Sequence, residues 1–230
     1  MNNECLLCGK PLEYIPQPVE MECSICHKKE VSKTMCQDGH YICNECHTKG
    51  MDRIWNICLS SASKNPVAII EALMEEEFCH MHGPEHHTMV GAALLTAYKN
   101  AGGDIDLPWA LEEIKHRGQQ VPGGACGFWG ACGADLSSGM YISIVTGSTP
   151  LASTTFGLSH EMTGKALLSI GEVGGPRCCK RDSYLAIKEA VAFTKEHLKV
   201  EMEESSIVCR WSKENNQCIG MACPFFTAKR

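Results

Sequence analysis

The sequence predicts a mainly α-helical protein in which an all-helical C-terminal domain follows a small cysteine-rich module. Two observations support this fold class. Cysteine and histidine recur in close pairs within the first 50 residues. Beyond residue 64, apolar residues recur at helical spacing between helix start and stop signals, and strand signals are sparse. We therefore expect a Cys/His module in residues 1–50, a connector in residues 51–64 and a helical domain in residues 65–230.

Four close pairs supply eight candidate metal ligands in the module. They are Cys5 and Cys8, Cys23 and Cys26, Cys36 and His40, and Cys43 and Cys46. This set suits two closed tetrahedral zinc sites, as in zinc-ribbon and cross-brace modules. A segment this short buries too little apolar surface to fold alone, so bound zinc is expected to supply its folding free energy. Cysteine pairs separated by two residues also favour a shared metal over a disulfide.

The spacing leaves two ways of sharing these ligands. In a sequential arrangement, the first four cysteines hold one ion and the last four ligands hold the other. In a crossed arrangement, the ligand sets are Cys23, Cys26, Cys43 and Cys46, and Cys5, Cys8, Cys36 and His40. The stretch from Cys23 to Cys46 resembles the first half of a RING-like cross-brace, which favours the crossed arrangement. The second half of that motif is missing, so no ubiquitin ligase activity is implied. His27 and His47 are surplus to both arrangements and are expected to be solvated.

The composition narrows the class of protein. A net charge of −6 gives no basic surface for nucleic acid, and no apolar run is long enough to span a membrane. No signal peptide precedes the 16 cysteines, so we expect a cytoplasmic protein in which many thiols are metal ligands. The expected partners are a small anionic molecule or a partner enzyme, and the sequence leaves a homo-oligomer open.

Helix signals recur along the C-terminal domain. Asn65-Pro66 predicts an N-cap residue followed by proline at the first helical position. One further helix is expected to run through Val90 and Tyr98 and to stop at Gly102-Gly103. Others are expected from Leu107 to His116, from Leu151 to Ile170 and from Ser183 to Leu198. Residues 125–146 are rich in glycine, alanine and serine, which suits closely packed, buried helices.

The segment Cys79–His87 is dense in side chains that carry chemistry. It holds four histidines, one cysteine and one glutamate in nine residues. His86 and His87 are expected at a helix N-terminus, where the helix dipole lowers the pKa of imidazole and favours anions. We interpret His82, Glu85, His86 and His87 as candidate catalytic or metal-binding residues. The alternative is a hydrogen-bonded helix start without a chemical role.

A second set of cysteines lies in the C-terminal domain. Its members are Cys126, Cys132, Cys178, Cys179, Cys209, Cys218 and Cys223. Glycines around the first four let backbone approach a bulky group, and Arg177, Lys180 and Arg181 are candidates for binding an anionic substrate. Thiolates close to cations and backbone amides suit an iron–sulfur cluster such as [4Fe–4S]. The alternative is that some of these cysteines are small core residues.

Two runs in this domain resemble a known family. Gly130–Ala134 and Pro176–Asp182 are similar to motifs in the α-chain domain of iron–sulfur L-serine dehydratases and the related cysteine desulfidases. The resemblance covers residues 80–195 and implies an all-helical domain with Cys132 and Cys178 as cluster ligands. The family's middle ligand has no counterpart, because Leu167–Ser169 take its place. The whole chain also resembles an uncharacterised family of cysteine-rich proteins from anaerobic bacteria and archaea.

These patterns support three functions. The first is an iron–sulfur or other metal-dependent enzyme, a lyase or sulfur-handling catalyst, that acts on a small anionic substrate. The second is a non-catalytic metal, cluster or sulfur delivery protein whose zinc module docks a partner enzyme. The third is a zinc-stabilised adaptor whose other cysteines are core residues. The enzyme predicts a cavity where the histidine segment meets the two glycine- and cysteine-rich loops, whereas the delivery protein predicts exposed cysteines.

Overall fold

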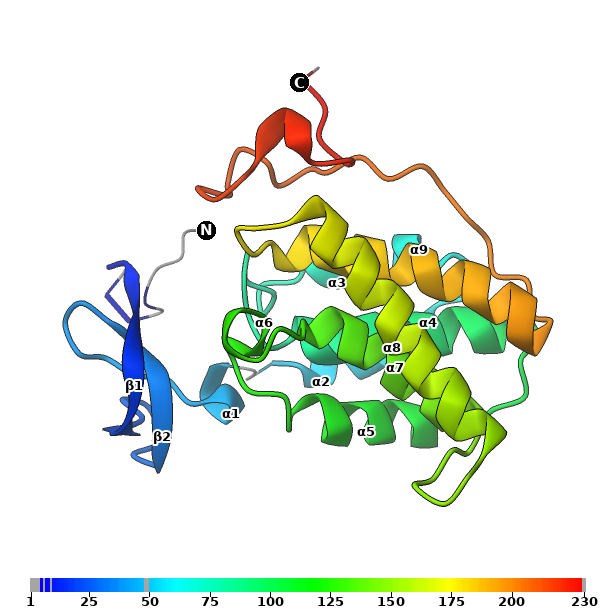
Figure 1. Ribbon diagram of the computed structural model, residues 1–230, viewed down its shortest axis with the longest axis horizontal. Coiled ribbons are helices and arrows are strands. Elements are labelled where there is room, and N and C mark those ends of the chain that lie inside the picture. The colour runs from blue at the N-terminus through cyan, green and yellow to red at the C-terminus, as the bar shows by residue number, and fades with distance from the viewer. Residues whose placement is uncertain (1–4, 6, 9, 48–49, 229–230) are drawn as a thin grey trace.

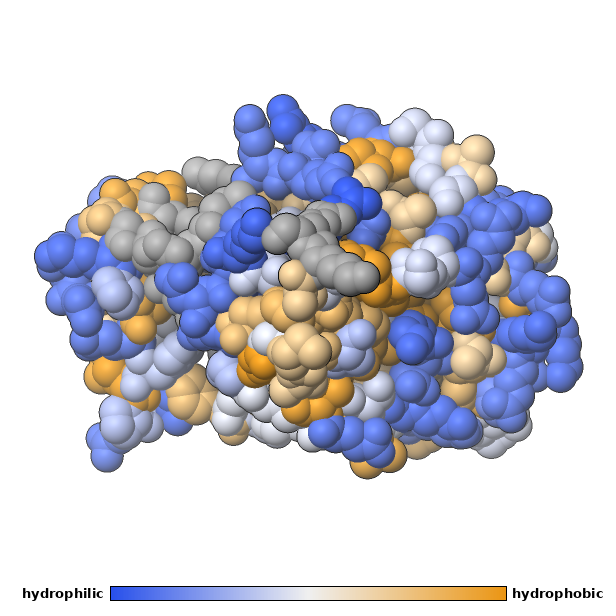
Figure 2. Space-filling view, turned by 90° about the horizontal axis from the view of Figure 1, so that it is seen from above, coloured by the Kyte–Doolittle hydropathy of each residue, from blue (hydrophilic) through white to orange (hydrophobic). Residues whose placement is uncertain are grey.

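The computed structural model describes residues 5, 7–8, 10–47 and 50–228, and it confirms the mainly α-helical fold. A two-stranded sheet lies at one side of a body of packed helices, and the C-terminal segment crosses the top of that body (Figure 1). Seen from the side of this segment, hydrophilic residues cover much of the surface, with hydrophobic groups between them (Figure 2). Among the residues described, no helix combines the length and the apolar character that a membrane span requires.

The N-terminal module is a β-hairpin followed by a single helical turn. β1 (Leu12–Glu22) pairs antiparallel with β2 (Lys29–Cys36), and α1 (Asn44–His47) follows. Of the six buried side chains described before residue 50, all except that of Met21 belong to cysteines. Apolar packing therefore contributes little to this module, as expected for a fold that depends on bound metal.

The helical body is built around one central helix. Its α-helices are α2 (Asp52–Ser60), α3 (Pro66–Met74), α4 (His86–Asn100), α5 (Leu107–Gly118), α6 (Ala125–Phe128), α7 (Gly133–Val145), α8 (Thr154–Val173) and α9 (Cys179–Leu198). The central helix α4 packs against α2, α3, α5, α7 and α9, and nearly all of its residues are buried. Ile54 and Cys58 of α2 belong to the same core, so the connector region contributes to the helical body.

Small residues let these helices approach one another closely. The ideal Cβ of an alanine at position 91 in α4 would lie 2.5 Å from Ile114 Cδ1 of α5. The same atom at position 139 in α7 would lie 1.9 Å from Thr163 Oγ1 of α8. Gly91 and Gly139 therefore fix the spacing of α4 and α7 from their neighbours. The expected close packing of the small-residue segment is confirmed in α7, which is largely buried.

The observed helix starts agree better with the capping residues in the sequence than with the first apolar residue of each expected helix. Asn65 caps α3, because its side chain accepts hydrogen bonds from Val67 N at 2.9 Å and from Ala68 N at 3.3 Å. α4 begins at His86, which confirms the expected place of His86 and His87 at a helix N-terminus. In contrast, α9 begins at Cys179, four residues before the predicted start at Ser183.

Residues 199–228 form a tail that contains no helix or strand except the 3₁₀ helix η1 (Gly220–Ala222). Glu203 N donates to Lys64 O at 2.9 Å, and Cys209 N donates to Phe225 O at 2.8 Å. Arg210 forms an ion pair with Glu71 of α3 at 3.0 Å. Met202 and Phe225 are also buried in the core of the helical body, so apolar packing holds the tail as well as these polar contacts.

We expect Asn65→Ala to lower the free energy of unfolding by about 1 kcal/mol, because two N-terminal amides of α3 lose their acceptor. Urea denaturation followed by circular dichroism measures this change. Asn65→Asp keeps an acceptor oxygen and is the matched control. An equal loss of stability in both variants would contradict the capping role.

We expect Cys23→Ser to release bound metal and unfold residues 1–50 while the helical signal in circular dichroism stays near native. The reason is that the buried residues of the module are mainly cysteines, whereas the helices share an apolar core. Metal analysis and circular dichroism measure the two effects, with the neighbouring Ser24→Ala as the control. Unfolding of the whole chain would show instead that the two parts form one cooperative unit.

Candidate metal centres and central cavity

The module brings its eight candidate ligands together as two tetrads, in the crossed arrangement. One tetrad contains Cys5, Cys8, Cys36 and His40, and the other contains Cys23, Cys26, Cys43 and Cys46. The ligand atoms of each tetrad lie within 4.8 Å of one another. Cys8 Sγ is 3.8 Å from Cys36 Sγ, and Cys26 Sγ is 3.6 Å from Cys43 Sγ. Sulfurs bound to one tetrahedral zinc are about 3.8 Å apart, so both tetrads fit a single ion of this kind.

Backbone amides favour the thiolate form in the second tetrad. Cys43 N donates to Cys23 Sγ at 3.3 Å, and Cys46 N donates to Cys43 Sγ at 3.4 Å. Burial opposes ionisation of Cys23, but hydrogen bonds from backbone amides, first that of Cys43, lower its pKa to about 6. The thiolate is the form that binds metal, so Cys23 is prepared for a ligand role, whereas burial raises the pKa of Cys43 and of Cys46.

A third candidate metal site joins the module to the helical body. His47 ends α1, His80 precedes α4 and Glu85 is the N-cap residue of α4. Glu85 Oε2 is 3.5 Å from His47 Nδ1, and Glu85 Oε1 is 3.5 Å from His80 Nδ1. Nitrogen and oxygen ligands on one tetrahedral metal are about 3.4 Å apart. These three side chains therefore fit one divalent metal ion.

Buried polar atoms in this group lack hydrogen-bond partners. Glu85 is fully buried, and Glu85 Oε2, His47 Nδ1 and His80 Nδ1 form no hydrogen bond with the described residues. Burial alone would raise the pKa of Glu85, but His47 and His80 beside it hold that pKa well below its usual value. The carboxylate is therefore charged without water around it, which is costly unless a cation is close.

Glycine at position 83 makes room for this carboxylate. The Cβ of an alanine there would lie 2.1 Å from Glu85 Oε2 and 2.5 Å from Glu85 Oε1. Any larger side chain would therefore displace both oxygens from the two imidazoles. Gly83 was part of the predicted histidine segment, but the sequence alone gave no reason to single it out.

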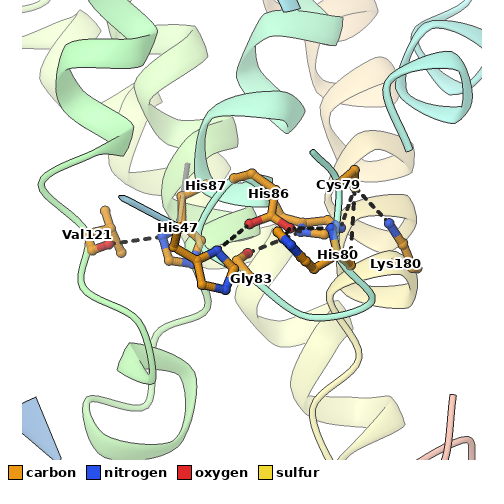
Figure 3. Close-up of polar contacts among 9 residues, drawn as sticks. His47, Cys79, His80, Gly83, His86, His87, Val121 and Lys180 are labelled. Atoms are coloured by element: carbon orange, nitrogen blue, oxygen red, sulfur yellow. Dashed lines mark hydrogen bonds and ion pairs between the residues drawn. The ribbon is translucent and has the colours of Figure 1, made fainter. Parts of the chain in front are cut away.

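A second group shares Glu85 with the first. The ligand atoms of Cys79, Glu85 and His86 lie within 4.8 Å of one another. His86 Nδ1 donates to Gly83 O at 3.1 Å, and His86 Nε2 lies 3.8 Å from Cys79 Sγ. Lys180 Nζ donates to Cys79 Sγ at 2.8 Å (Figure 3). Burial and the nearby Lys180 cation lower the pKa of His86 to about 3, so its ring is neutral near pH 7.

A cavity of about 580 Å³ lies where the module, the histidine segment and the two glycine- and cysteine-rich loops meet. Its wall includes His82, His86 and His87, Cys126 and Cys132, and Arg177 and Cys179. His47 and Gly83 also line it, so the third candidate metal site borders this central cavity.

Three helices begin at the central cavity. α4 starts at His86, α7 at Gly133 and α9 at Cys179, and each of these residues lines the cavity wall. The N-cap side chain bonds no amide at any of these three helix starts. The first amides of a helix lack partners within it, and its dipole is positive at that end. Each start also carries one acidic residue, in order Glu85, Asp135 and Asp182.

His87 lines the central cavity, with one ring nitrogen bonded to the backbone. Its Nδ1 donates to Val121 O at 3.0 Å, which leaves Nε2 as an acceptor (Figure 3). Burial lowers the pKa of His87 below its usual value, so the ring is neutral near pH 7. The Cβ of an alanine at Gly133 would lie 1.9 Å from His87 Cδ2, so the ring packs directly against that glycine.

The remaining candidate residues occupy different places. His82 Nε2 contacts Asn215 Oδ1 at 3.2 Å, and burial together with the Arg177 cation lowers the pKa of His82 to about 4. Arg177 lines the central cavity, and its guanidinium carbon lies 5.2 Å from the centre of the Tyr14 ring. Lys180 and Arg181 are buried and are not among the residues that line this cavity. Lys180 contacts Cys79, and Arg181 Nε donates to Asp182 Oδ1 at 2.9 Å.

The C-terminal cysteines divide into two sets. Cys126, Cys132 and Cys179 line the central cavity, whereas Cys178, Cys209, Cys218 and Cys223 line a smaller cavity beneath the tail. Cys132 and Cys178, which the dehydratase resemblance pairs as ligands of one cluster, therefore line different cavities. Cys178 is the N-cap residue of α9 and Cys179 is its first residue, and these two neighbours also line different cavities.

The expectation of a solvated His47 is wrong. The side chain of His47 is only 20% exposed and faces Glu85, whereas that of His27 is 74% exposed, as expected. The only signal in the sequence is that His47 directly follows the ligand candidate Cys46, which fixes its direction once the module has folded. Its partner Glu85 is remote in the chain, so spacing could not reveal the pair.

The fold and the site define a helical, cysteine-rich protein with several candidate metal centres. Residues 54–226 match a family model described as "Family of unknown function (DUF5714)". This match covers well over half of the chain, so the chain belongs to this family, which agrees with the expected uncharacterised family. No curated protein and no solved structure matches the chain. The matched region includes the helical body and the central-cavity cysteines, and both tetrads lie before it.

We expect Gly83→Ala to lower the metal content by about one ion per chain, because the new Cβ displaces the Glu85 oxygens from His47 and His80. Metal analysis after loading with zinc measures this loss. Gly164→Ala is the matched control, since nothing lies within 4 Å of a Cβ at position 164 of α8. Equal metal content in the wild type and in both variants would contradict the third site.

Proposed function

We propose that this chain is a metal-dependent enzyme that acts on a small anionic substrate in the central cavity. One observation carries the proposal: α4, α7 and α9 all begin at the central cavity, and the wall of this cavity also contains the neutral His87 and Arg177. Helix N-termini and a guanidinium bind carboxylates and similar anions. A neutral imidazole in the same wall can accept a proton from the bound molecule.

His47, His80 and Glu85 are the residues that would hold the metal. Their unpaired ligand atoms face one another at separations that suit one ion, which supports this choice. A divalent metal held by these residues would supply Lewis-acid chemistry. His47 also lines the central cavity, so that chemistry would lie at the edge of the cavity.

The reaction class that we propose is elimination from a small hydroxy- or thio-amino acid, a lyase or sulfur-handling reaction. Arg177 and the helix amides hold the carboxylate while His87 Nε2 accepts the proton from the adjacent carbon. The carbon–oxygen or carbon–sulfur bond at the next carbon breaks, and the leaving hydroxide or hydrosulfide takes a proton from the wall. Burial raises the pKa of Cys132, so its thiol is protonated and can supply that proton. The resemblance to L-serine dehydratases and cysteine desulfidases supports this class.

A metal or sulfur delivery protein is the second candidate function. Cys8 and Cys26 are exposed, so each tetrad has one ligand that a partner protein can reach. The hairpin also exposes apolar side chains, such as Val31 at 67%, that could contact a partner. This function requires neither the central cavity nor the orientation of His87.

Turnover of L-serine or L-cysteine is the measurement that tests the enzyme. Protein purified without oxygen and loaded with metal is expected to release a 2-keto acid, with ammonia and, from L-cysteine, hydrogen sulfide. We expect Gly133→Ala to lower kcat/KM by about 100-fold, because its Cβ displaces the His87 ring. Gly164→Ala, which adds a Cβ in open space, is expected to keep the wild-type rate.

The result that would contradict the enzyme is metal-loaded wild-type protein that converts neither amino acid but passes its metal to an acceptor such as a chelating peptide. That outcome would favour the delivery protein. Equal rates for Gly133→Ala and wild type would remove His87 from the reaction while leaving the enzyme in place.

A further inference from the structure

Four cysteines that do not line the central cavity lie around a smaller cavity beneath the tail. Cys178 is the N-cap residue of α9, and Cys209, Cys218 and Cys223 come from the tail. All four line one small cavity, together with Trp211 and other aromatic residues. The tail therefore brings three cysteines to a fourth that a helix of the body holds in place.

Two hydrogen-bond donors contact these sulfurs, and two cationic side chains line the same cavity. Asn215 Nδ2 donates to Cys178 Sγ at 3.5 Å, and Gly220 N donates to Cys218 Sγ at 3.4 Å. Lys180 and Arg181 line the same cavity. Donors and positive charges next to sulfur stabilise the thiolates and the inorganic sulfides of an iron–sulfur cluster.

The spacing of these sulfurs differs from that of the two tetrads. In each tetrad the ligand atoms lie within 4.8 Å of one another, but no three of these four sulfurs meet that limit. A single tetrahedral zinc needs sulfurs about 3.8 Å apart, so this set is too open for one ion. The four irons of a cubane cluster each take one thiolate at a separate corner, which requires a wider set.

We propose that Cys178, Cys209, Cys218 and Cys223 bind a [4Fe–4S] cluster that fastens the tail to the start of α9. The tail lacks regular structure apart from η1, and Trp211 and Phe225 pack it against Tyr184 of α9. A cluster would add a covalent link between this packed tail and the start of the same helix. With four cysteine ligands, no iron has an open position for substrate. The cluster therefore serves the structure or electron transfer, and the proposal stands independently of the elimination reaction.

One side chain connects this cluster site to the central cavity. Asn215 is buried, and its Nδ2 contacts Cys178 Sγ while its Oδ1 contacts His82 Nε2 at 3.2 Å. His82 in turn lines the central cavity. Loss of the cluster is therefore expected to disturb His82 through Asn215 as well as releasing the tail.

Reconstitution of the full chain with ferrous iron and sulfide, without oxygen, tests the proposal. We expect about four irons and four acid-labile sulfides per chain, with a charge-transfer band in the visible spectrum. Cys218→Ala and Cys223→Ala should lose most of the iron, the sulfide and the band. Cys126→Ala and Cys132→Ala, which remove cysteines of the central cavity, are the matched controls and should keep all three.

Thiol protection tests the same ligands without substitution, in case a variant fails to fold. In the reconstituted wild type, Cys178, Cys209, Cys218 and Cys223 should resist alkylation and become reactive after the cluster is removed, as peptide mapping would show. The proposal is overturned if reconstituted protein holds no iron and sulfide, if it takes up zinc at this site instead, or if Cys126 and Cys132 are the protected pair. None of these outcomes depends on turnover, so they are separate from a failure of the enzyme.

Discussion

The fully buried carboxylate of Glu85 is the constraint that fixes the module against the helical body. A charge removed from water needs partners on every side, and those of Glu85 come from two parts of the chain. His47 approaches from the module, while His80 and His86 approach from the segment that leads into α4. Neither part can move away without leaving the carboxylate uncompensated. Together with the contact of Arg177 with Tyr14, this ionised group determines how a weakly packed hairpin meets a well-packed core.

Close helix packing extends this arrangement to the whole central cavity. Gly91 and Gly139 let α4 and α7 lie close to their neighbours, so that the starts of three helices reach one wall. Helix N-termini have amides without partners, and gathering three of them in one place raises the local positive potential. The proposed binding of an anion in this cavity therefore depends on the backbone arrangement as much as on Arg177, against the acidic residues Glu85, Asp135 and Asp182 at the same helix starts.

The sequence predicted what depends on local spacing. The fold class, the cap at Asn65 and the eight clustered ligands follow from patterns a few residues long, and the cross-brace resemblance favoured the observed arrangement of the tetrads. Such short patterns cannot predict contacts between segments that are far apart in the sequence. No residue near His47 in the sequence indicates that Glu85 is its partner. Spacing also gives no reason to expect that the neighbours Cys178 and Cys179 line different cavities, as they do. The start of α9 was placed one turn late, because the polar residues 179–182 that form its first turn interrupt the apolar pattern.

The position of His47, one residue after Cys46, imposes an order on metal loading. The direction of His47 depends on the turn of α1, and that turn is formed by a tetrad ligand and its neighbours. If each group binds an ion, the third candidate site would be complete only after the second tetrad has taken up its own. A cell short of the metal for the tetrads would then lose the third site as well, however abundant the metal for that site was. The proposed chemistry of the helical body would in this way depend on the metal supply of the module.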